Sequence, residues 1–151
     1  MNVSLRDWLG NGWLVKHQTS AEEIRDLLGV VDRDLADCEA SGLSPDWRLN
    51  IAYNAALQTA TAALATSGYR AARESHHYRV IQSLAYTIGA NHQLITQLDQ
   101  FRKKRNLAGY ELAGMVSEQE AKEMVALAKT LRANVKDWLR QNHPGLLNGK
   151  G

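Results

Sequence analysis

The stretch from residue 44 to residue 68 reads SPDWRLNIAYNAALQTATAALATSG and predicts the central helix of a helical bundle. Ser44 is a good N-cap, Pro45 fits the first helical turn, and Asp46 favours the positive end of the helix dipole. Alanines recur on several faces of this helix, which lets neighbouring helices approach closely on more than one side. Gly68 is expected to end the helix.

Four further helices are predicted from N-cap residues and from apolar residues spaced three and four positions apart. They run from Ser20 to Gly42, from about Ser75 to Ile88, from near Asn91 into the FRKKRNLAGYE segment, and from Ser117 to the residue before His143. The first and last begin with apparent capping boxes, Ser20 with Glu23 and Ser117 with Glu120.

The expected fold class is therefore all-α: a five-helix, up-and-down antiparallel bundle over residues 19–142. No segment shows the alternating pattern of a strand. Residues 1–18 are expected to form a mostly extended arm whose tryptophans, Trp8 and Trp13, dock on the chain's own core, with docking on a partner as the alternative. Residues 143–151 are expected to be a frayed tail.

Composition agrees with one globular domain, since 151 residues include 44% hydrophobic and 23% charged side chains. The net charge of +2 is too small to indicate nucleic acid or membrane binding by itself. The single cysteine, Cys38, excludes an intrachain disulfide and favours a reducing compartment. The chain shows neither a secretory signal nor an apolar run of about 20 residues, so we expect a cytoplasmic protein without a membrane partner.

The densest basic run lies in FRKKRNLAGYE, residues 101–111. Arg105 continues the apolar stripe of its helix, so its guanidinium is expected to point toward the bundle. Two interpretations fit a core-facing arginine: a structural ion pair with Asp34 or Asp32 of the first helix, or a cleft that binds phosphate. The stripe consists of Leu94, Leu98, Phe101, Arg105, Ala108 and Leu112.

Arg102, Asn106 and Tyr110 share a second face of the same helix at four-residue spacing. A basic patch with an adjacent tyrosine could hold RNA by phosphate contacts and stacking. Lys103 and Lys104 are expected to be solvated. 

Two adjacent histidines, His76 and His77, open the third predicted helix. Adjacent positions point about 100° apart on a helix, so they cannot form a four-residue-spaced metal pair. His77 lies on an apolar stripe and is expected to be a core histidine, with an acid–base role as the alternative. The chain shows no metal, phosphate-loop or nucleophile motif, so we expect neither a metal nor a cofactor.

The order of these features resembles the HEPN-domain proteins (higher eukaryotes and prokaryotes nucleotide-binding) from about Ser20 to Leu139. The resemblance rests on the segments VDRDL (31–35), AYNAAL (52–57), SHH (75–77), RNLAGY (105–110) and SEQEA (117–121). Nuclease members of that family carry an arginine, a polar residue and, after four to six positions, a histidine. They dimerise so that two such motifs line one cleft and act on RNA phosphodiesters.

The resemblance matches Arg105 to the family's arginine and Asn106 to its polar residue, whereas Tyr110 stands in the place of the histidine. A tyrosine with a pKa of about 10 is a poor general base near pH 7. This form resembles members without nuclease activity, several of which pair with a nucleotidyltransferase in toxin–antitoxin systems. Gly109 is expected to end the helix, so that Tyr110 turns back toward Arg105.

The resemblance implies a non-catalytic or weakly catalytic module that binds RNA, a nucleotide or a protein partner in a toxin–antitoxin or defence setting. A homodimer is expected, with a nucleotidyltransferase as a possible partner. The candidate ligand-binding residues are Asp34, His77, Arg102, Arg105, Asn106 and Tyr110. One alternative is a metal-independent ribonuclease that uses Arg105, Asn106 and Tyr110 at a dimer cleft. Another is an assembly protein in which Arg105 makes only a structural ion pair.

Overall fold

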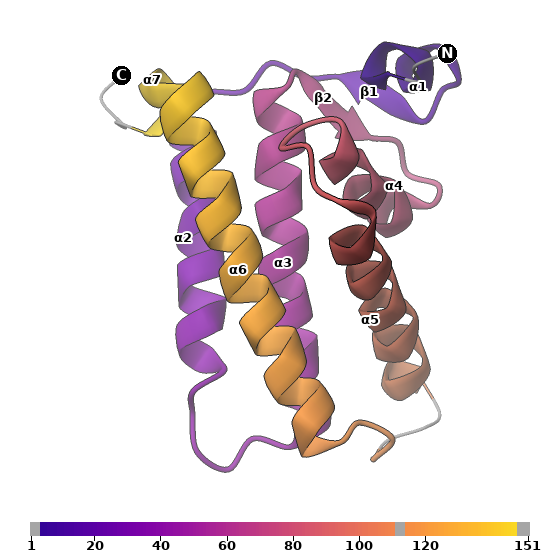
Figure 1. Cartoon of the computed structure of the whole chain (residues 1–151), viewed down its shortest axis with the longest axis vertical. Coiled ribbons are helices and arrows are strands. Elements are labelled where there is room, and N and C mark those ends of the chain that lie inside the picture. Colours follow the sequence, from indigo (N-terminus) through magenta and orange to yellow (C-terminus); the bar gives the residue numbers. More distant parts are fainter. Residues whose placement is uncertain (1–3, 111–113, 148–151) are drawn as a thin grey trace.

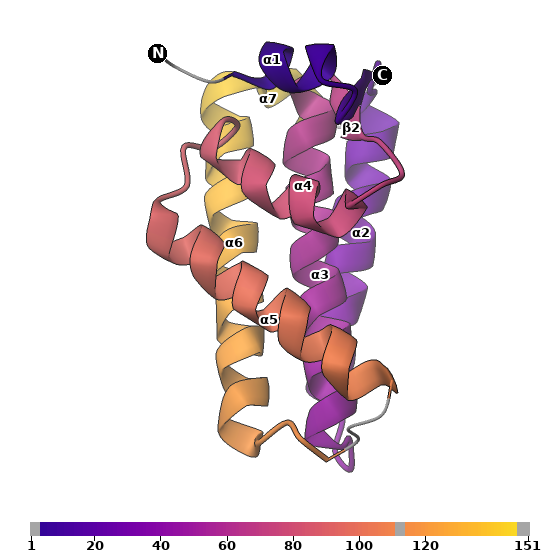
Figure 2. The same cartoon turned by 90° about the vertical axis from the view of Figure 1, so that its right-hand side faces the viewer.

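The computed structural model describes residues 4–110 and 114–147, and most of these residues are helical (Figure 1, Figure 2). The helical character predicted from the sequence is confirmed. The described elements are α1 (Leu5–Gly10), β1 (Leu14–Lys16), α2 (Ala21–Asp37), α3 (Pro45–Thr66), β2 (Tyr69–Ala71), α4 (His76–Gln82), η1 (Ser83–Ala85), α5 (His92–Tyr110), α6 (Glu118–Asn142) and α7 (Pro144–Leu147).

Helix α3 is the central helix, as its sequence predicts. Helices α2, α4, α5 and α6 all pack against it. Small side chains let these neighbours approach on several faces, which explains why the helix has no single apolar stripe. Its buried alanines are Ala52, Ala55, Ala56, Ala60, Ala62, Ala63 and Ala65.

The order of helix directions differs from a simple up-and-down bundle. Helices α2 and α3 run antiparallel, but α3 and α6 lie side by side and run in the same direction (Figure 1). Their first turns meet, since Arg48 Nη1 lies 3.0 Å from Glu118 Oε2. Helix α5 crosses α3 obliquely and brings the chain back to the end where α3 begins (Figure 2). Helix α6 starts from there and packs on α3.

The expectations of an extended arm and of no strands are wrong. Residues 5–10 form α1, and β1 pairs antiparallel with β2, with Leu14 opposite Ala71. Strands of three residues are too short to show an alternating pattern, and their pairing depends on tertiary contact. The tryptophans dock on the chain's own core as predicted, because Trp8 is only 6% exposed and its ring lies 5.8 Å from that of Trp13.

Helix starts agree well with the predicted caps. Side-chain oxygens of Ser44, Asn91 and Ser117 each accept a backbone N–H of the following turn. The reciprocal capping box at Ser117 is confirmed, because Glu120 accepts the Ser117 N–H at 3.0 Å.

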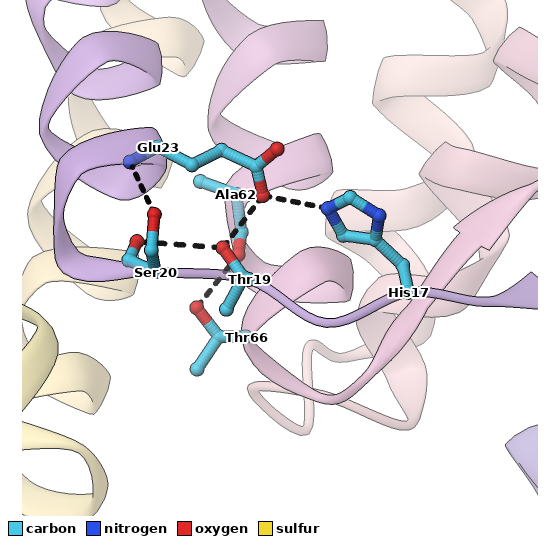
Figure 3. A network of polar contacts seen from close by, with 6 residues as sticks. All are labelled: His17, Thr19, Ser20, Glu23, Ala62 and Thr66. Carbon is cyan, nitrogen blue, oxygen red and sulfur yellow. Dashed lines mark hydrogen bonds and ion pairs between the residues drawn. The ribbon is translucent and has the colours of Figure 1, made fainter.

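The capping box predicted at Ser20 is only half formed (Figure 3). The Ser20 hydroxyl accepts the Glu23 N–H at 3.1 Å. The Glu23 carboxylate turns away from Ser20 and accepts hydrogen bonds from Thr19 Oγ1 at 2.6 Å and from His17 Nε2 at 2.7 Å. The Thr19 hydroxyl and the His17 imidazole lower the pKa of Glu23. The carboxylate thus joins the segment before α2 to the helix.

Helix ends are less predictable than helix starts. Helix α2 ends at Asp37, five residues before the predicted Gly42, and α4 ends at Gln82 and continues as the 3₁₀ turn η1. Helix α5 runs through Gly109 to Tyr110, so Gly109 does not end it. An internal glycine costs a helix about 1 kcal/mol, which one favourable packed face can offset.

The tail is ordered where it is described. Residues 144–147 form α7, and Leu146 and Leu147 pack against the hydrophobic core. The expectation of fraying is therefore wrong for residues 143–147, whereas residues 148–151 lie outside the described part. None of the helices that the structure describes is long and apolar enough to span a bilayer.

Candidate functional site

One face of the N-terminal half of α3 carries polar side chains and an exposed indole. Positions three, four and seven apart lie on the same side of a helix, and here they are occupied by Trp47, Asn50, Ile51 and Asn54. The indole of Trp47 is 63% exposed, an unusual state for a tryptophan. This face looks onto the C-terminal half of α5.

A hollow of about 530 Å³ lies between these elements, and we call it the α3–α5 groove. Its volume falls in the range of roughly 300–1,000 Å³ that is usual for small-ligand sites. The groove is lined by Asp34, Trp47, Asn50, Ile51, Asn54, Arg105 and Asn106. Of the six predicted ligand-binding residues, the structure brings Asp34, Arg105 and Asn106 together here.

Arg105 points toward the bundle, as the stripe on its helix predicts. Its Nε donates to Asn50 Oδ1 at 2.9 Å, and its Cζ lies 5.6 Å from the centre of the Tyr53 ring. The side chain is half-buried. Within the described residues, its terminal guanidinium nitrogens have no hydrogen-bond or ion-pair partner. The charged end of a half-buried arginine is thus left open to the groove.

The predicted ion pair of Arg105 with Asp34 or Asp32 is not formed. Asp34 is buried at 5% exposure, and it accepts hydrogen bonds from Asn54 Nδ2 at 2.7 Å and from Arg33 Nη2 at 3.2 Å. Asp32 pairs with Arg132 of α6. The Asp34 carboxylate is thus hydrogen-bonded to Arg33 and to the Asn54 amide of α3, and it does not pair with Arg105.

Arg102 faces a different hollow. Its Nε donates to Asp99 at 2.7 Å, and its Cζ lies 5.3 Å from the Tyr78 ring. This second hollow opens at the start of α4 and includes His77. Asn106 lines both hollows, so the two are neighbours at α5.

The lysines of the basic run are not both freely solvated. Lys103 is 67% exposed and lies 3.6 Å from Asp99, which agrees with the predicted surface position. Lys104 is 28% exposed and pairs with Glu120 at 3.3 Å, so it joins α5 to the first turn of α6. The expectation for Lys104 is therefore wrong.

His77 is half-buried at the edge of the second hollow and is not a core histidine. Its ring lies 6.0 Å from that of Tyr53, which in turn faces Arg105. Burial, Arg105, His76 and Arg102 lower the pKa of His77, so the imidazole is neutral near pH 7. Burial raises the pKa of Tyr53 to about 12, and its hydroxyl has no hydrogen-bond partner among the described residues.

The side chain of Tyr110 lies outside the described part of the chain, as do those of Ala108 and Leu112. The backbone of α5 is helical through Tyr110. Positions 105 and 110 of a continuous helix diverge by about 140°. The helix therefore does not end at Gly109, and whether the Tyr110 side chain turns toward Arg105 lies outside the described residues.

Four groove residues were not site candidates in the sequence: Trp47, Asn50, Ile51 and Asn54. The spacing of Trp47, Asn50 and Asn54 could have indicated them. It places polar side chains on one face of a helix that is otherwise rich in alanine. Within the described residues, no cluster of three or more His, Cys, Asp and Glu side chains could hold a metal ion.

Comparisons with known proteins do not identify the chain: no family model matches it, and no curated protein or solved structure is significantly similar. An open guanidinium, amide groups and an exposed indole suit a ligand with a negative charge and a flat ring.

Proposed function

We propose that the chain is a HEPN-like helical module that binds single-stranded RNA, one nucleotide of which occupies the α3–α5 groove. The observation that carries the proposal is the open end of Arg105 next to the exposed indole of Trp47. These two groups recognise the two parts of a nucleotide, its phosphate and its base.

The phosphate would bind Arg105. A guanidinium offers planar, paired donors that match phosphate oxygens, and charge-assisted hydrogen bonds of this kind are about twice as strong as neutral ones. Asn50 holds Nε and so fixes the plane of the guanidinium while leaving its terminal nitrogens free. A preorganised donor loses less conformational entropy when it binds.

The base would stack on Trp47. Stacking of a base on an aromatic side chain contributes about 1–3 kcal/mol and tolerates every base, because each has a π-face. The amides of Asn50 and Asn106 lie on the same surface and can reach the edges of a base. Recognition of unpaired bases is the usual mode of RNA binding.

The resemblance to HEPN-domain proteins leads to the same surface through Arg105 and Asn106. A homodimer and a nucleotidyltransferase partner in a toxin–antitoxin setting belong to the proposal through that resemblance. The reading as an assembly protein with Arg105 in a structural ion pair loses its basis, because Asn50 and not a carboxylate accepts the Arg105 N–H.

Fluorescence anisotropy with two labelled 12-mers, an intact single-stranded RNA and an abasic strand of equal length, tests both halves of this proposal. Arg105→Ala should weaken binding of both strands, since both carry phosphates. Trp47→Ala should weaken binding of the intact RNA by roughly five-fold to a hundred-fold and leave the abasic strand unaffected.

Arg140→Ala is the matched control, because Arg140 lies near the far end of α6 and pairs with Asp137. It should bind RNA like the wild type. The proposal fails if the wild type does not bind RNA, or if Arg105→Ala binds as tightly as Arg140→Ala.

A further inference from the structure

The second hollow, next to the α3–α5 groove, has a volume of about 480 Å³ and is lined only by residues that carry hydrogen-bond donors. None of these lining residues is acidic. Asn106 lines the groove as well, and the others belong to this hollow: Arg73, Ser75, His76, His77, Tyr78 and Arg102. The hollow is therefore a positively charged surface beside the groove.

Most of these donors are not used by the fold. Within residues 4–110 and 114–147, the side chains of Arg73, Ser75, His76 and His77 have no hydrogen-bond or ion-pair partner. The ring centres of His76 and His77 are 5.9 Å apart, so the two imidazoles lie together at the hollow. Even a neutral imidazole has one N–H to donate. An anion with several oxygens is the ligand that such a set of donors fits.

Arg102 is held in position on the α5 side of the hollow. Its Nε donates to Asp99 Oδ1 at 2.7 Å, and its Cζ lies 5.3 Å from the centre of the Tyr78 ring. Its terminal nitrogens have no partner among the described residues. Arg102 thus repeats the arrangement of Arg105, in which one nitrogen fixes the guanidinium and the others stay open. A donor that is fixed before binding loses less conformational entropy.

The backbone at Ser75 is held in an unfavourable conformation. Its φ of 54° and ψ of 35° lie in the left-handed region, and within the described residues it is the only residue other than glycine with a positive φ. Side chains with a Cβ atom rarely adopt this conformation, and residues that hold it often lie at functional sites. The Ser75 hydroxyl makes no capping hydrogen bond to α4, so it stays available to a ligand.

We infer that the second hollow binds a terminal phosphomonoester of the RNA strand whose neighbouring nucleotide lies in the α3–α5 groove. An internal phosphate carries one negative charge. A terminal phosphate carries close to two charges and has three oxygens that accept hydrogen bonds. Two guanidinium groups, two imidazoles and a hydroxyl match the terminal phosphate and exceed what an internal one needs. The inference rests on the proposed RNA binding and makes the groove and the hollow together a site for the end of a strand.

Competition against an internally labelled 12-mer, followed by fluorescence anisotropy with the full chain, tests this inference. The competitors are three unlabelled RNAs of one sequence: one with hydroxyls at both ends, one with a 5′-phosphate and one with a 3′-phosphate. One phosphorylated strand should bind at least ten-fold more tightly than the hydroxyl-ended strand, which is the gain expected of a charge-assisted hydrogen bond. The strand that gains identifies the end that the hollow takes.

A methyl ester of the same terminal phosphate separates the monoester from a diester. The ester keeps the phosphorus and one negative charge but loses the second charge and one free oxygen. It should bind within about three-fold of the hydroxyl-ended strand. Equal affinity of the phosphate and its methyl ester would contradict the inference.

Arg73→Ala tests whether the gain arises in this hollow. It should reduce the ratio of the two affinities, phosphorylated over hydroxyl-ended, to less than about three-fold. Arg70→Ala is the matched control, because Arg70 is another exposed arginine of the same segment and does not line the hollow. It should keep the ten-fold ratio. Circular dichroism should give both variants thermal midpoints near that of the wild type, since both side chains are exposed.

The outcomes distinguish this inference from the proposed function. If the wild type binds the hydroxyl-ended and the phosphorylated strands equally well, the inference is wrong and the proposed function stands. A ratio that persists in Arg73→Ala also overturns the inference. If the wild type binds none of the strands, both are wrong.

Discussion

A polar cluster lies near each end of α3. The two clusters differ in how many of their hydrogen-bonding groups have partners within the fold. Near the C-terminal end, the Glu23 carboxylate is held by Thr19 and His17, in the segment that leads into α2 (Figure 3). Near the N-terminal end, Arg105 has one neutral partner, Asn50, and faces open space. The first cluster has its partners within the fold, whereas the second has donors left over.

Under the proposed function, this difference separates a structural cluster from a binding one. Polar groups that serve the fold tend to be hydrogen-bonded within it, because an unpaired buried group costs about 1–3 kcal/mol. In the proposed function, the donors left open beside the exposed indole of Trp47 find their partner in the bound nucleotide. Changes at the two clusters should therefore move different observables.

The largest effect should come from removing both open groups of the groove together. The double variant Trp47→Ala with Arg105→Ala loses the base stack and the phosphate contact, so RNA affinity should fall at least a hundred-fold. Its thermal midpoint should stay within a few degrees of the wild type, because Trp47 is mostly exposed. Anisotropy and circular dichroism measure the two quantities, and a collapsed midpoint with unchanged affinity would reverse the assignment.

Within the groove, the hydrogen bond between Asn54 and Asp34 stabilises the fold and is not expected to bind a ligand. Asn54→Ala removes the 2.7 Å hydrogen bond to a buried carboxylate and should lower the free energy of unfolding by about 1.5–3 kcal/mol. Urea denaturation measures this change. Asn50→Ala is the comparison, because its partner Arg105 can turn to water, so its cost should be clearly smaller.

At the cluster of Glu23, Thr19 and His17, Glu23→Ala should destabilise the fold without affecting RNA binding. Loss of two hydrogen bonds to a side chain that is 38% exposed should lower the free energy of unfolding by about 1 kcal/mol, which is about 2–4 °C for a chain of this size. Glu22→Ala, also in the first turn of α2, is the control and should have a smaller effect. Equal shifts in the two variants would show that only the helix dipole matters.

The stabilisation by Glu23 should depend on pH with a definite sign. The hydroxyl of Thr19 and the imidazole of His17 lower the pKa of Glu23 below its reference value of 4.5. The folded state therefore favours the carboxylate, and the contribution is complete above pH 4.5 and is lost as the pH falls through the lowered pKa. The midpoints of the wild type and Glu23→Gln should differ at pH 6 and converge in acid.

The smallest predicted effect is on the salt dependence of RNA binding. If Arg73, Arg102 and Arg105 each neutralise one phosphate, log K should fall against log salt with a slope of about −2. Arg105→Ala should reduce the magnitude of that slope by about 0.7. A slope near zero would mean that the groove does not use phosphate contacts.

The sequence predicts the parts of the fold that depend on local chemistry. Caps such as Ser44 and Ser117 require only a hydroxyl and the next turn, and the inward direction of Arg105 follows from its place on an apolar stripe. The strands β1 and β2 were missed because three residues give no readable period. The box at Ser20 failed because His17 and Thr19 compete for the same carboxylate.

The partners within the site depend on how the helices are placed. Asp34 and Asn50 lie on different helices, and the choice between them as the partner of Arg105 depends on how α2, α3 and α5 are rotated. No local pattern contains that information. The same holds for His77, which follows an apolar stripe in sequence but is half-buried and lines a hollow together with residues of α5.

The most direct test of the account is the RNA-induced shift in thermal midpoint, measured for the wild type and for Arg105→Ala. At an RNA concentration of about 100 times Kd, binding should stabilise the wild type by about 2.7 kcal/mol, which raises its midpoint by roughly 5–10 °C. Arg105→Ala should melt within a few degrees of the wild type without RNA, and RNA should shift its midpoint by much less. The account is contradicted if RNA raises both midpoints equally, or if Arg105→Ala alone costs the roughly 3–5 kcal/mol of a broken buried ion pair.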